Sequence, residues 1–402
     1  MNAPRILVVS PVVPFPPIGG ARARTYHLVQ ALSQRFHVTL LGFSYGASSS
    51  PPPFPVEIIE VPWDWPDPYR AMHAGDAAAT GALRSCPEPW FASILESTRF
   101  EAELRRIVSH IDVVLLERSG SGRFLSCLPD GIPRVLDLHD VHSAMALCEA
   151  KGKTGPDRVT ALAEAERTLE FERGVASACD VCLVCSTLDA ARARELLAVE
   201  HVEVIPNGVD TAYFRPESGC PTSGELLFTG RMDYSPNVQA ACYFAREILP
   251  LVRRRRPEMI FRIVGANPAQ EVLALAAPDV VVHGAVPDMR PYYWGAEEVV
   301  VPLLQGGGTR VKILEAAASG KAIVTTTVGV EGLRFAAAAD LVVADAPIEF
   351  ADAILRLTAD PDRRARLGAR ARAAALAYDW AAIGDALCKL LLSSGVTTLA
   401  RT

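Results

Sequence analysis

Short apolar runs recur along the chain, and each is followed by a loop and then by a helical pattern. In the first half, several runs show no alternation of apolar and polar residues, as is typical of strands covered by helices on both faces. Helical stretches lie between the runs, such as Ala21–Phe36, where Tyr26, Val29, Leu32 and Phe36 share one stripe. The predicted strands of this half are Ile6–Ser10, Val38–Phe43, Val56–Val61, Val113–Glu117, Val135–Leu138, Val181–Cys185 and Val202–Ile205.

A second series of the same kind begins after residue 225. Strands that alternate with helices predict right-handed βαβ units and a parallel sheet. Two complete series therefore predict an α/β chain with two doubly wound, Rossmann-like domains. The predicted strands of this half are Leu226–Thr229, Ile260–Val264, Val280–His283, Val299–Leu303, Ala322–Thr326 and Leu341–Val343, with helices near 237–252, 268–276, 288–296 and 310–319.

The join between the two series lies at Pro206-Asn207-Gly208, a turn-forming tripeptide. We expect residues 1–205 to form the first domain and residues 206–379 the second. Residues 380–402 begin with an amphipathic helical pattern, which we expect to pack back on the first domain.

Composition narrows the class of protein. The chain has 402 residues, more than one hydrophobic core usually serves, and half of them are apolar. Its net charge of −6 argues against nucleic acid as the main partner. No export-like segment or run of about 20 apolar residues is visible, and the nine cysteines form no disulfide-like framework, so we expect a cytoplasmic protein. The basic run Arg253–Arg256 is interpreted as a solvated helix end, with peripheral membrane contact as the alternative.

Two glycine-containing segments follow predicted strands, at the edge where open α/β sheets bind ligands. Gly19 and Gly20 lie between the first strand and its helix, where backbone N–H groups and a helix N-terminus favour an anion. The alternative is a flexible loop before a helix. Arg231 follows Gly230 at the end of another strand and suits bidentate capture of a phosphate, unless it is only a solvated arginine.

The most informative segment joins a strand to a helix through three consecutive glycines at 306–308. A backbone nest, a helix N-terminus and two cations there favour a diphosphate, and a carboxylate one turn later suits two ribose hydroxyls. The alternative, an exposed helix start with an intrahelical ion pair, leaves the glycines unexplained. The candidate donor-binding residues are Gly307, Gly308, Thr309, Arg310, Lys312 and Glu315.

Acids and histidines cluster after the predicted strand Val135–Leu138. His139 has the chemistry of a general base or of a group that holds a sugar hydroxyl, with an aspartate to orient its ring. Asp140 and His142 are weaker candidates on the acceptor side. A purely structural histidine is the alternative.

Together these segments resemble the retaining GT-B glycosyltransferases of family 4. The resemblance rests on IPNGVD at Ile205–Asp210, on FTGRMD around Arg231, and on KILEAAASGKAIVTT at Lys312–Thr326, and it covers nearly the whole chain. The variants DYSPN and GGGTRVKILEA are similar to a subgroup with exopolysaccharide and natural-product sugar transferases. The resemblance implies two facing Rossmann-like domains with the donor in the cleft between them, and retention at the anomeric carbon.

The resemblance also implies residue roles. Gly19 and Gly20 approach the donor diphosphate, Arg231 binds it as a catalytic residue, and Glu315 matches the ribose-binding carboxylate. His139 matches the catalytic histidine near the transferred sugar.

Two positions depart from the family pattern. Gly307 stands where the first carboxylate of the Glu-x7-Glu pattern is usual, and Asn237 stands where a lysine is usual. We expect Arg310 and Lys312 to supply the missing charge, and the N–H groups of Gly307 and Gly308 to replace the missing side chain.

The predicted function is transfer of a sugar from a UDP-, GDP- or dTDP-linked donor to a glycan, lipid-linked or natural-product acceptor. No Asp-x-Asp motif is present to hold a divalent ion, so we expect no metal and no cofactor. One alternative is a nucleotide-sugar 2-epimerase, which needs no acceptor. Another is a non-catalytic subunit that binds a nucleotide sugar.

Overall fold

The computed structural model describes residues 3–17, 19–44, 51–63, 87–217 and 224–393. Contacts divide the chain into two compact units, each treated by itself below. Unit 1 comprises Met1–Pro206 and Ile383–Thr402, and unit 2 comprises Asn207–Ala382.

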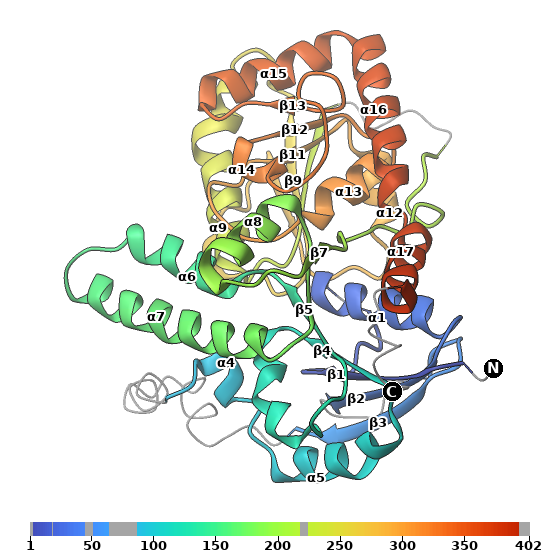
Figure 1. Cartoon of the computed structure of the whole chain (residues 1–402). Helices are drawn as coiled ribbons and strands as arrows, with labels where there is room; N and C mark the ends of the chain where they lie inside the picture. The colour runs from blue at the N-terminus through green and yellow to red at the C-terminus, as the bar shows by residue number, and fades with distance from the viewer. Residues whose placement is uncertain (1–2, 18, 45–50, 64–86, 218–223, 394–402) are drawn as a thin grey trace. The chain divides into compact units, whose positions relative to one another are not determined.

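Unit 1 is built on a parallel sheet of seven strands in the order β3-β2-β1-β4-β5-β6-β7 (Figure 1). The predicted apolar runs are these strands, and the residues of β4 are all buried because helices cover the sheet. The strand order reverses between β1 and β4, the position where open sheets of this kind hold ligands. The strands are β1 (Arg5–Ser10), β2 (His37–Ser44), β3 (Glu57–Pro62), β4 (Val113–Glu117), β5 (Arg134–His139), β6 (Val181–Val184) and β7 (Val202–Val204).

The helices of unit 1 follow its strands. In Figure 1, α6 and α7 form a long antiparallel pair that projects from the sheet. The helices are α1 (Gly20–Leu32), α4 (Trp90–Ser93), α5 (Thr98–Ile107), η1 (Val108–His110), η2 (Ser119–Cys127), α6 (His142–Lys151), α7 (Gly155–Ser177) and α8 (Thr187–Leu197).

Unit 2 repeats the plan with a parallel sheet of six strands in the order β10-β9-β8-β11-β12-β13. Its strand order again reverses between the first strand of the unit and the fourth, here β8 and β11. The strands are β8 (Glu225–Thr229), β9 (Ile260–Val264), β10 (Val280–His283), β11 (Glu298–Val301), β12 (Ile323–Thr325) and β13 (Val342–Val343).

Two helical predictions in unit 2 differ from the structure. The helix expected near 237–252 is divided by a π turn, η3, ahead of Pro250, and the helix expected near 268–276 has a single turn. Proline removes a backbone donor from the helical ladder, which limits regular continuation. The helices are α9 (Ser235–Tyr243), η3 (Phe244–Ile248), α10 (Leu249–Arg253), α11 (Gln270–Leu273), α12 (Arg290–Gly295), α13 (Val311–Ala318), α14 (Thr327–Val330), α15 (Pro347–Ala359), α16 (Pro361–Ala375) and η4 (Leu376–Tyr378).

The last helix, α17 (Trp380–Ser393), contributes its residues from Ile383 onward to unit 1. It packs closely on α1, because a Cβ on Gly384 would lie 2.2 Å from the Cβ of Ala31. The thiol of Cys388 also donates to the carbonyl of Ala31 at 3.5 Å.

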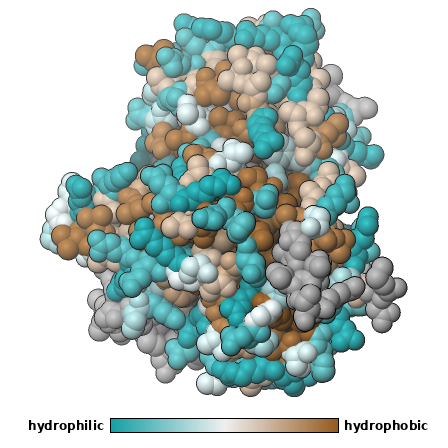
Figure 2. Space-filling view, viewed as in Figure 1, coloured by the Kyte–Doolittle hydropathy of each residue, from teal (hydrophilic) through white to brown (hydrophobic). Residues whose placement is uncertain are grey.

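The surface of the described residues is mixed in hydropathy. Figure 2 shows hydrophilic and hydrophobic residues interspersed over the face of unit 2 that carries α15 and α16. Arg253, Arg255 and Arg256 each form an ion pair with an acidic side chain of the same unit, which agrees with a solvated helix end. Among the described helices, none has the length and apolarity needed to cross a membrane.

Candidate functional site

The topology of unit 1 gathers its predicted site residues at one edge. Glu117 ends β4 and His139 ends β5, and these strands are neighbours in which Glu117 pairs with Asp137. Gly19 caps the N-terminus of α1, the helix that follows β1. No side chain caps this helix, and a Cβ on Gly19 would meet open space. Gly19 has a φ of 88°, which favours glycine.

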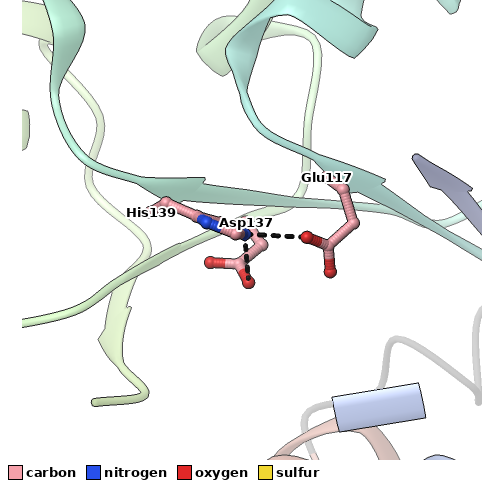
Figure 3. Close-up of side chains that lie close together, drawn as sticks. All are labelled: Glu117, Asp137 and His139. Carbon is pink, nitrogen blue, oxygen red and sulfur yellow. Dashed lines mark hydrogen bonds and ion pairs between the residues drawn. The ribbon is translucent and has the colours of Figure 1, made fainter. Parts of the chain in front are cut away.

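His139 occupies a strained position. The register of β5 against β6 shifts between Asp137 and His139, and the φ of His139 is 60°, in the left-handed region. Such a conformation costs about 1–3 kcal/mol in a residue other than glycine and persists only where its surroundings enforce it. The buried ring places Nε2 2.7 Å from Oε2 of Glu117 and 3.5 Å from Oδ2 of Asp137 (Figure 3).

Asp137 is held from the other side by a buried arginine. Arg24 on α1 donates to both carboxylate oxygens of Asp137, at 2.8 and 2.9 Å. Burial raises the pKa of Asp137, but the charge and hydrogen bonds of Arg24 outweigh burial and hold that pKa below its ordinary value.

The same cluster has the spacing of a metal site. One ligand atom from each of Glu117, Asp137 and His139 lies within 4.8 Å of the others. However, the guanidinium of Arg24 already supplies positive charge to both oxygens of Asp137. These side chains form a hydrogen-bond network with Arg24, in which Oε1 of Glu117 is buried and has no partner among the described residues.

The two acceptor-side candidates differ. Asp140 is only partly buried, directly after β5. His142 opens α6, where its Nδ1 lies 3.1 Å from the hydroxyl of Ser119 and its ring 4.7 Å from the ring of Phe91. Buried Glu172 accepts from the backbone N–H of His142 and so holds the start of this helix in place.

In unit 2, Arg231 follows β8 and is well exposed. Its guanidinium makes a two-pronged contact with Asp233, in which Nε donates at 3.0 Å and Nη2 at 2.6 Å. The carbonyl of Arg231 accepts from the side chain of Asn237, which fixes the turn after β8. The arginine thus lies at the carboxyl edge of the sheet, where its guanidinium is paired with Asp233.

The glycine loop after β11 is shaped by Arg310, which differs from the prediction that this arginine faces a diphosphate. Its guanidinium is buried and donates to the carbonyls of Gly306, Gly307 and Gly308. The loop can turn its carbonyls inward because Gly306 and Gly308 have positive φ, which glycine adopts readily. Arg310 therefore organises the loop instead of presenting a cation.

The outward side of this loop has unused donors. Within the described part of the chain, no hydrogen bond from the N–H groups of Gly307, Gly308 or Thr309 is found. The hydroxyl oxygen of Thr309 is buried and has no hydrogen-bond partner. Buried polar atoms without partners are rare, and a ligand is one explanation.

Lys312 and Glu315 lie on α13, directly after the loop. The ammonium of Lys312 donates to Oδ1 of Asn237 at 2.6 Å and lies 4.2 Å from the ring centroid of Phe228. Glu315 accepts from the hydroxyl of Tyr293 at 2.7 Å. Burial and the charge of Arg310 lower the pKa of Lys312 to about 7, and burial raises the pKa of Glu315 to about 7.

Three residues that contact the predicted site residues were not predicted from the sequence. Glu117 ends a predicted strand, so the rule that ligands lie beyond strand ends gave a signal for it. Arg24 and Tyr293 lie within helices and contact the clusters only through the tertiary fold. Nothing in their local sequence distinguishes them from surface residues.

Comparisons with known proteins identify the family. A model described as Glycosyltransferase Family 4 matches residues 18–213, and one described as Glycosyl transferases group 1 matches residues 223–360. The chain belongs to the family 4 glycosyltransferases. A D-inositol 3-phosphate glycosyltransferase from Kineococcus radiotolerans is 28% identical over 92% of this chain and 89% of its own length. A second, from Frankia alni, is 30% identical over 46% of this chain, and the match spans about half of its length (51%).

Solved structures show the fold of this glycosyltransferase. Sucrose-phosphate synthase from Thermosynechococcus elongatus superposes with a TM-score of 0.73 at 16% identity, covering 98% of this chain and 99% of its own. HepE from Anabaena, solved with UDP, has a TM-score of 0.67 at 14% identity, with coverages of 97% and 100%. The two parallel-sheet units of the glycosyltransferase therefore have the GT-B fold, as predicted. The names of these relatives give no support to the epimerase alternative.

Proposed function

We propose that this glycosyltransferase takes its sugar from a nucleoside diphosphate sugar, and that unit 2 binds the nucleotide. The observation that carries the proposal is the loop of Gly307, Gly308 and Thr309. Among the described residues, its N–H groups donate no hydrogen bond and the buried hydroxyl of Thr309 has no partner. These donors stand at the start of α13, where the helix dipole favours negative charge. A diphosphate matches both features.

Lys312 supplies the cation for this diphosphate. The family pattern has a lysine where this chain has Asn237, and the ammonium of Lys312 lies 2.6 Å from Oδ1 of Asn237. An ammonium from α13 thus lies beside the residue of α9 where the family pattern has its lysine. Gly230 leaves the room that this requires, because a Cβ there would lie 2.8 Å from Nζ of Lys312. Arg231 adds a second, exposed cation.

Glu315 binds the ribose. Tyr293 donates to Oε2 of Glu315, while Oε1 accepts from no other described residue. A carboxylate with one occupied oxygen keeps acceptor sites for ribose hydroxyls. The raised pKa of Glu315 shows that ionising this carboxyl without a ligand is costly, so hydroxyl donors stabilise its charge.

Unit 1 supplies the transfer chemistry in this proposal. Gly19 and Gly20 offer the N-terminus of α1 to the diphosphate, and His139 contacts the transferred sugar. Cations and backbone donors balance the charge of the leaving diphosphate, so transfer proceeds without a bound metal. Retention at the anomeric carbon is proposed from the family resemblance alone. The acceptor is a hydroxyl of a glycan, a lipid-linked sugar or a small molecule. The names of the curated relatives make an inositol phosphate the first acceptor to test.

Ligand-induced thermal shift tests the donor. UDP, GDP and dTDP, alone and with attached sugars, are added in excess with and without EDTA, starting from UDP because HepE was solved with it. A nucleotide at about 100 times its Kd stabilises the native state by about 2.7 kcal/mol. We expect one nucleotide to raise Tm equally with and without EDTA. No shift with any nucleotide would overturn the proposal.

Product analysis then separates the remaining alternatives. Transfer requires donor and acceptor together and yields a product whose anomeric configuration is read by proton NMR. An epimerase changes the donor alone. A non-catalytic subunit shows the thermal shift but yields neither product.

A further inference from the structure

Among the described residues, the ring of His139 contacts hydrogen-bond acceptors only through Nε2. This nitrogen lies 2.7 Å from Oε2 of Glu117 and 3.5 Å from Oδ2 of Asp137 (Figure 3). A carboxylate accepts hydrogen bonds and donates none. The contact of 2.7 Å therefore requires the proton of the ring to be on Nε2. No hydrogen bond to Nδ1 from another described residue is found.

Glu117 is itself held in place. Thr25 donates to Oε2 of Glu117 at 2.9 Å, so one oxygen accepts from both Thr25 and His139. Thr25 follows Arg24 on α1, and these consecutive residues fix the two carboxylates that face the ring. Glu117 and Asp137 are also paired in register across β4 and β5. The network thus joins one helix and two strands.

The backbone conformation of His139 is strained, and the hydrogen-bond network holds the residue in it. Its φ of 60° places a residue other than glycine in the left-handed region. The contact with Glu117 anchors the ring in the orientation that this backbone imposes, and it opposes a ring flip that would put Cε1 in the place of Nε2.

We infer that Glu117 is a positioning residue that holds His139 in the tautomer protonated at Nε2, so that Nδ1 is the nitrogen presented to the transferred sugar. The role of Nδ1 rests on the proposed function, which places His139 beside that sugar. In a neutral ring with its proton on Nε2, Nδ1 is an acceptor. The site therefore recognises a sugar that carries a hydroxyl at the position facing His139.

Nitrogen NMR of the free protein tests the tautomer without any substrate. The protein is labelled with 15N-histidine at neutral pH, and His139 is assigned from the signals that disappear in His139→Gln. We expect a protonated, pyrrole-type shift for Nε2 and an unprotonated, pyridine-type shift for Nδ1. The reverse pattern would overturn the inference even if the enzyme is fully active.

Kinetics tests the role of Glu117 through a matched pair of carboxylates. Glu117→Gln should lower kcat at least about 100-fold, because the same change of the carboxylate that orients a catalytic histidine in serine proteases lowers kcat about 10⁴-fold. Donor KM should change less than about threefold. The control is Glu298→Gln. Glu298 is also buried and accepts from a threonine, Thr358, at 3.0 Å, but it contacts no histidine among the described residues. Equal losses in the two variants would contradict a positioning role.

The Thr25 hydroxyl provides a milder test that preserves the charge. Thr25→Val removes the hydroxyl and keeps the shape, whereas Thr25→Ser keeps the hydroxyl. We expect about a tenfold loss of kcat in the valine variant, the size of one lost hydrogen bond to a charged group, and near-normal kcat in the serine variant. The opposite order would assign Thr25 a packing role. A normal kcat in His139→Ala would refute the proposed role of His139 and leave the tautomer result standing.

Discussion

Each unit gathers acidic and basic side chains at the carboxyl edge of its sheet, but the two clusters balance their charges differently. In unit 1, the carboxylates of Asp137 and Glu117 accept from the side chains of Arg24, Thr25 and His139. In unit 2, Lys312 and Glu315 have no direct ion pair with each other, and both have a pKa near 7. Unit 1 holds Asp137 ionised, with its pKa below the ordinary value.

This difference in pairing indicates that buried charges serve two purposes in this protein, fixing geometry in unit 1 and binding a ligand in unit 2. A network in which most polar atoms are already paired in the free protein fixes geometry, which suits a group that has to meet a reacting sugar in one orientation. In unit 1 the exception is Oε1 of Glu117, which is buried and has no partner among the described residues. A cluster that is incomplete in the free protein is unfavourable until a ligand supplies the missing partners. The same property is the reason that we propose this cluster as a binding site. The following predictions test this contrast.

The largest expected effect is on the chemical step in unit 1. His139→Ala should lower kcat by about 10²–10⁴-fold while donor KM changes little, because the lost group acts on the reacting sugar. His110→Ala, a change at an exposed histidine of the same unit, is the control. Steady-state kinetics at saturating donor measures both. A normal kcat would make His139 a structural residue.

The next effect is on stability. Arg24→Met leaves the buried carboxylate of Asp137 without its guanidinium, at a cost of roughly 3–5 kcal/mol. Arg106→Met breaks an exposed pair with Glu103 that has the same 2.8 Å contact, and should cost less than about 1 kcal/mol. Urea unfolding followed by circular dichroism compares them. Similar midpoints for the two variants would show that the network in unit 1 adds no stability.

In unit 2, removal of a charge should have the opposite effect on stability. Lys312→Met relieves the burial of an ammonium, so we expect an unchanged Tm or a rise of about 2–4 °C, together with about tenfold weaker nucleotide binding. Lys321→Met is the matched control. Its ammonium donates to the carbonyls of Trp294 and Ala296, away from the loop, and its loss should not alter nucleotide affinity. A lower Tm with full nucleotide affinity in Lys312→Met would contradict the proposed contrast between the two units, because Lys312 would then serve stability and not binding.

The smallest expected effect is on the pH dependence of the folding stability of unit 2. Burial raises the pKa of Glu315 from 4.5 to about 7, so the folded state binds more protons between these values, and this group's contribution to stability falls as pH rises from 4.5 to 7. Burial lowers the pKa of Lys312 from 10.5 to about 7, so the unfolded state binds more protons there, and stability rises from pH 7 to 10.5.

Difference measurements isolate these two groups. The Tm of Glu315→Gln minus that of the parent should increase from pH 5 to 7. The difference for Lys312→Met should shrink from pH 7 to 10. Glu298, whose pKa burial raises to about 8, is present in both proteins of each comparison and cancels. Differences that do not change with pH would show that neither group titrates as proposed.

Much of the fold could be predicted because apolar patterns are local. The runs at Val113–Glu117 and Ile260–Val264 are strands with the predicted bounds. The predicted ends of strands and helices were less accurate where the ends depend on tertiary packing. β11 ends at Val301, two residues before the predicted end, and α13 begins at Val311, because the glycine loop and its arginine intervene.

The sequence alone determined that this chain has two α/β units, with glycine loops, a histidine and a carboxylate at or near strand ends; the glycosyltransferase activity came from the resemblance to family 4. These features follow from period, turn chemistry and motif spacing, all of which are local along the chain. Only the tertiary structure decided that Arg310 holds the loop, that Lys312 lies beside Asn237, and that Glu117 holds His139. Contacts between residues tens of positions apart depend on strand register and helix packing, and no local pattern encodes them.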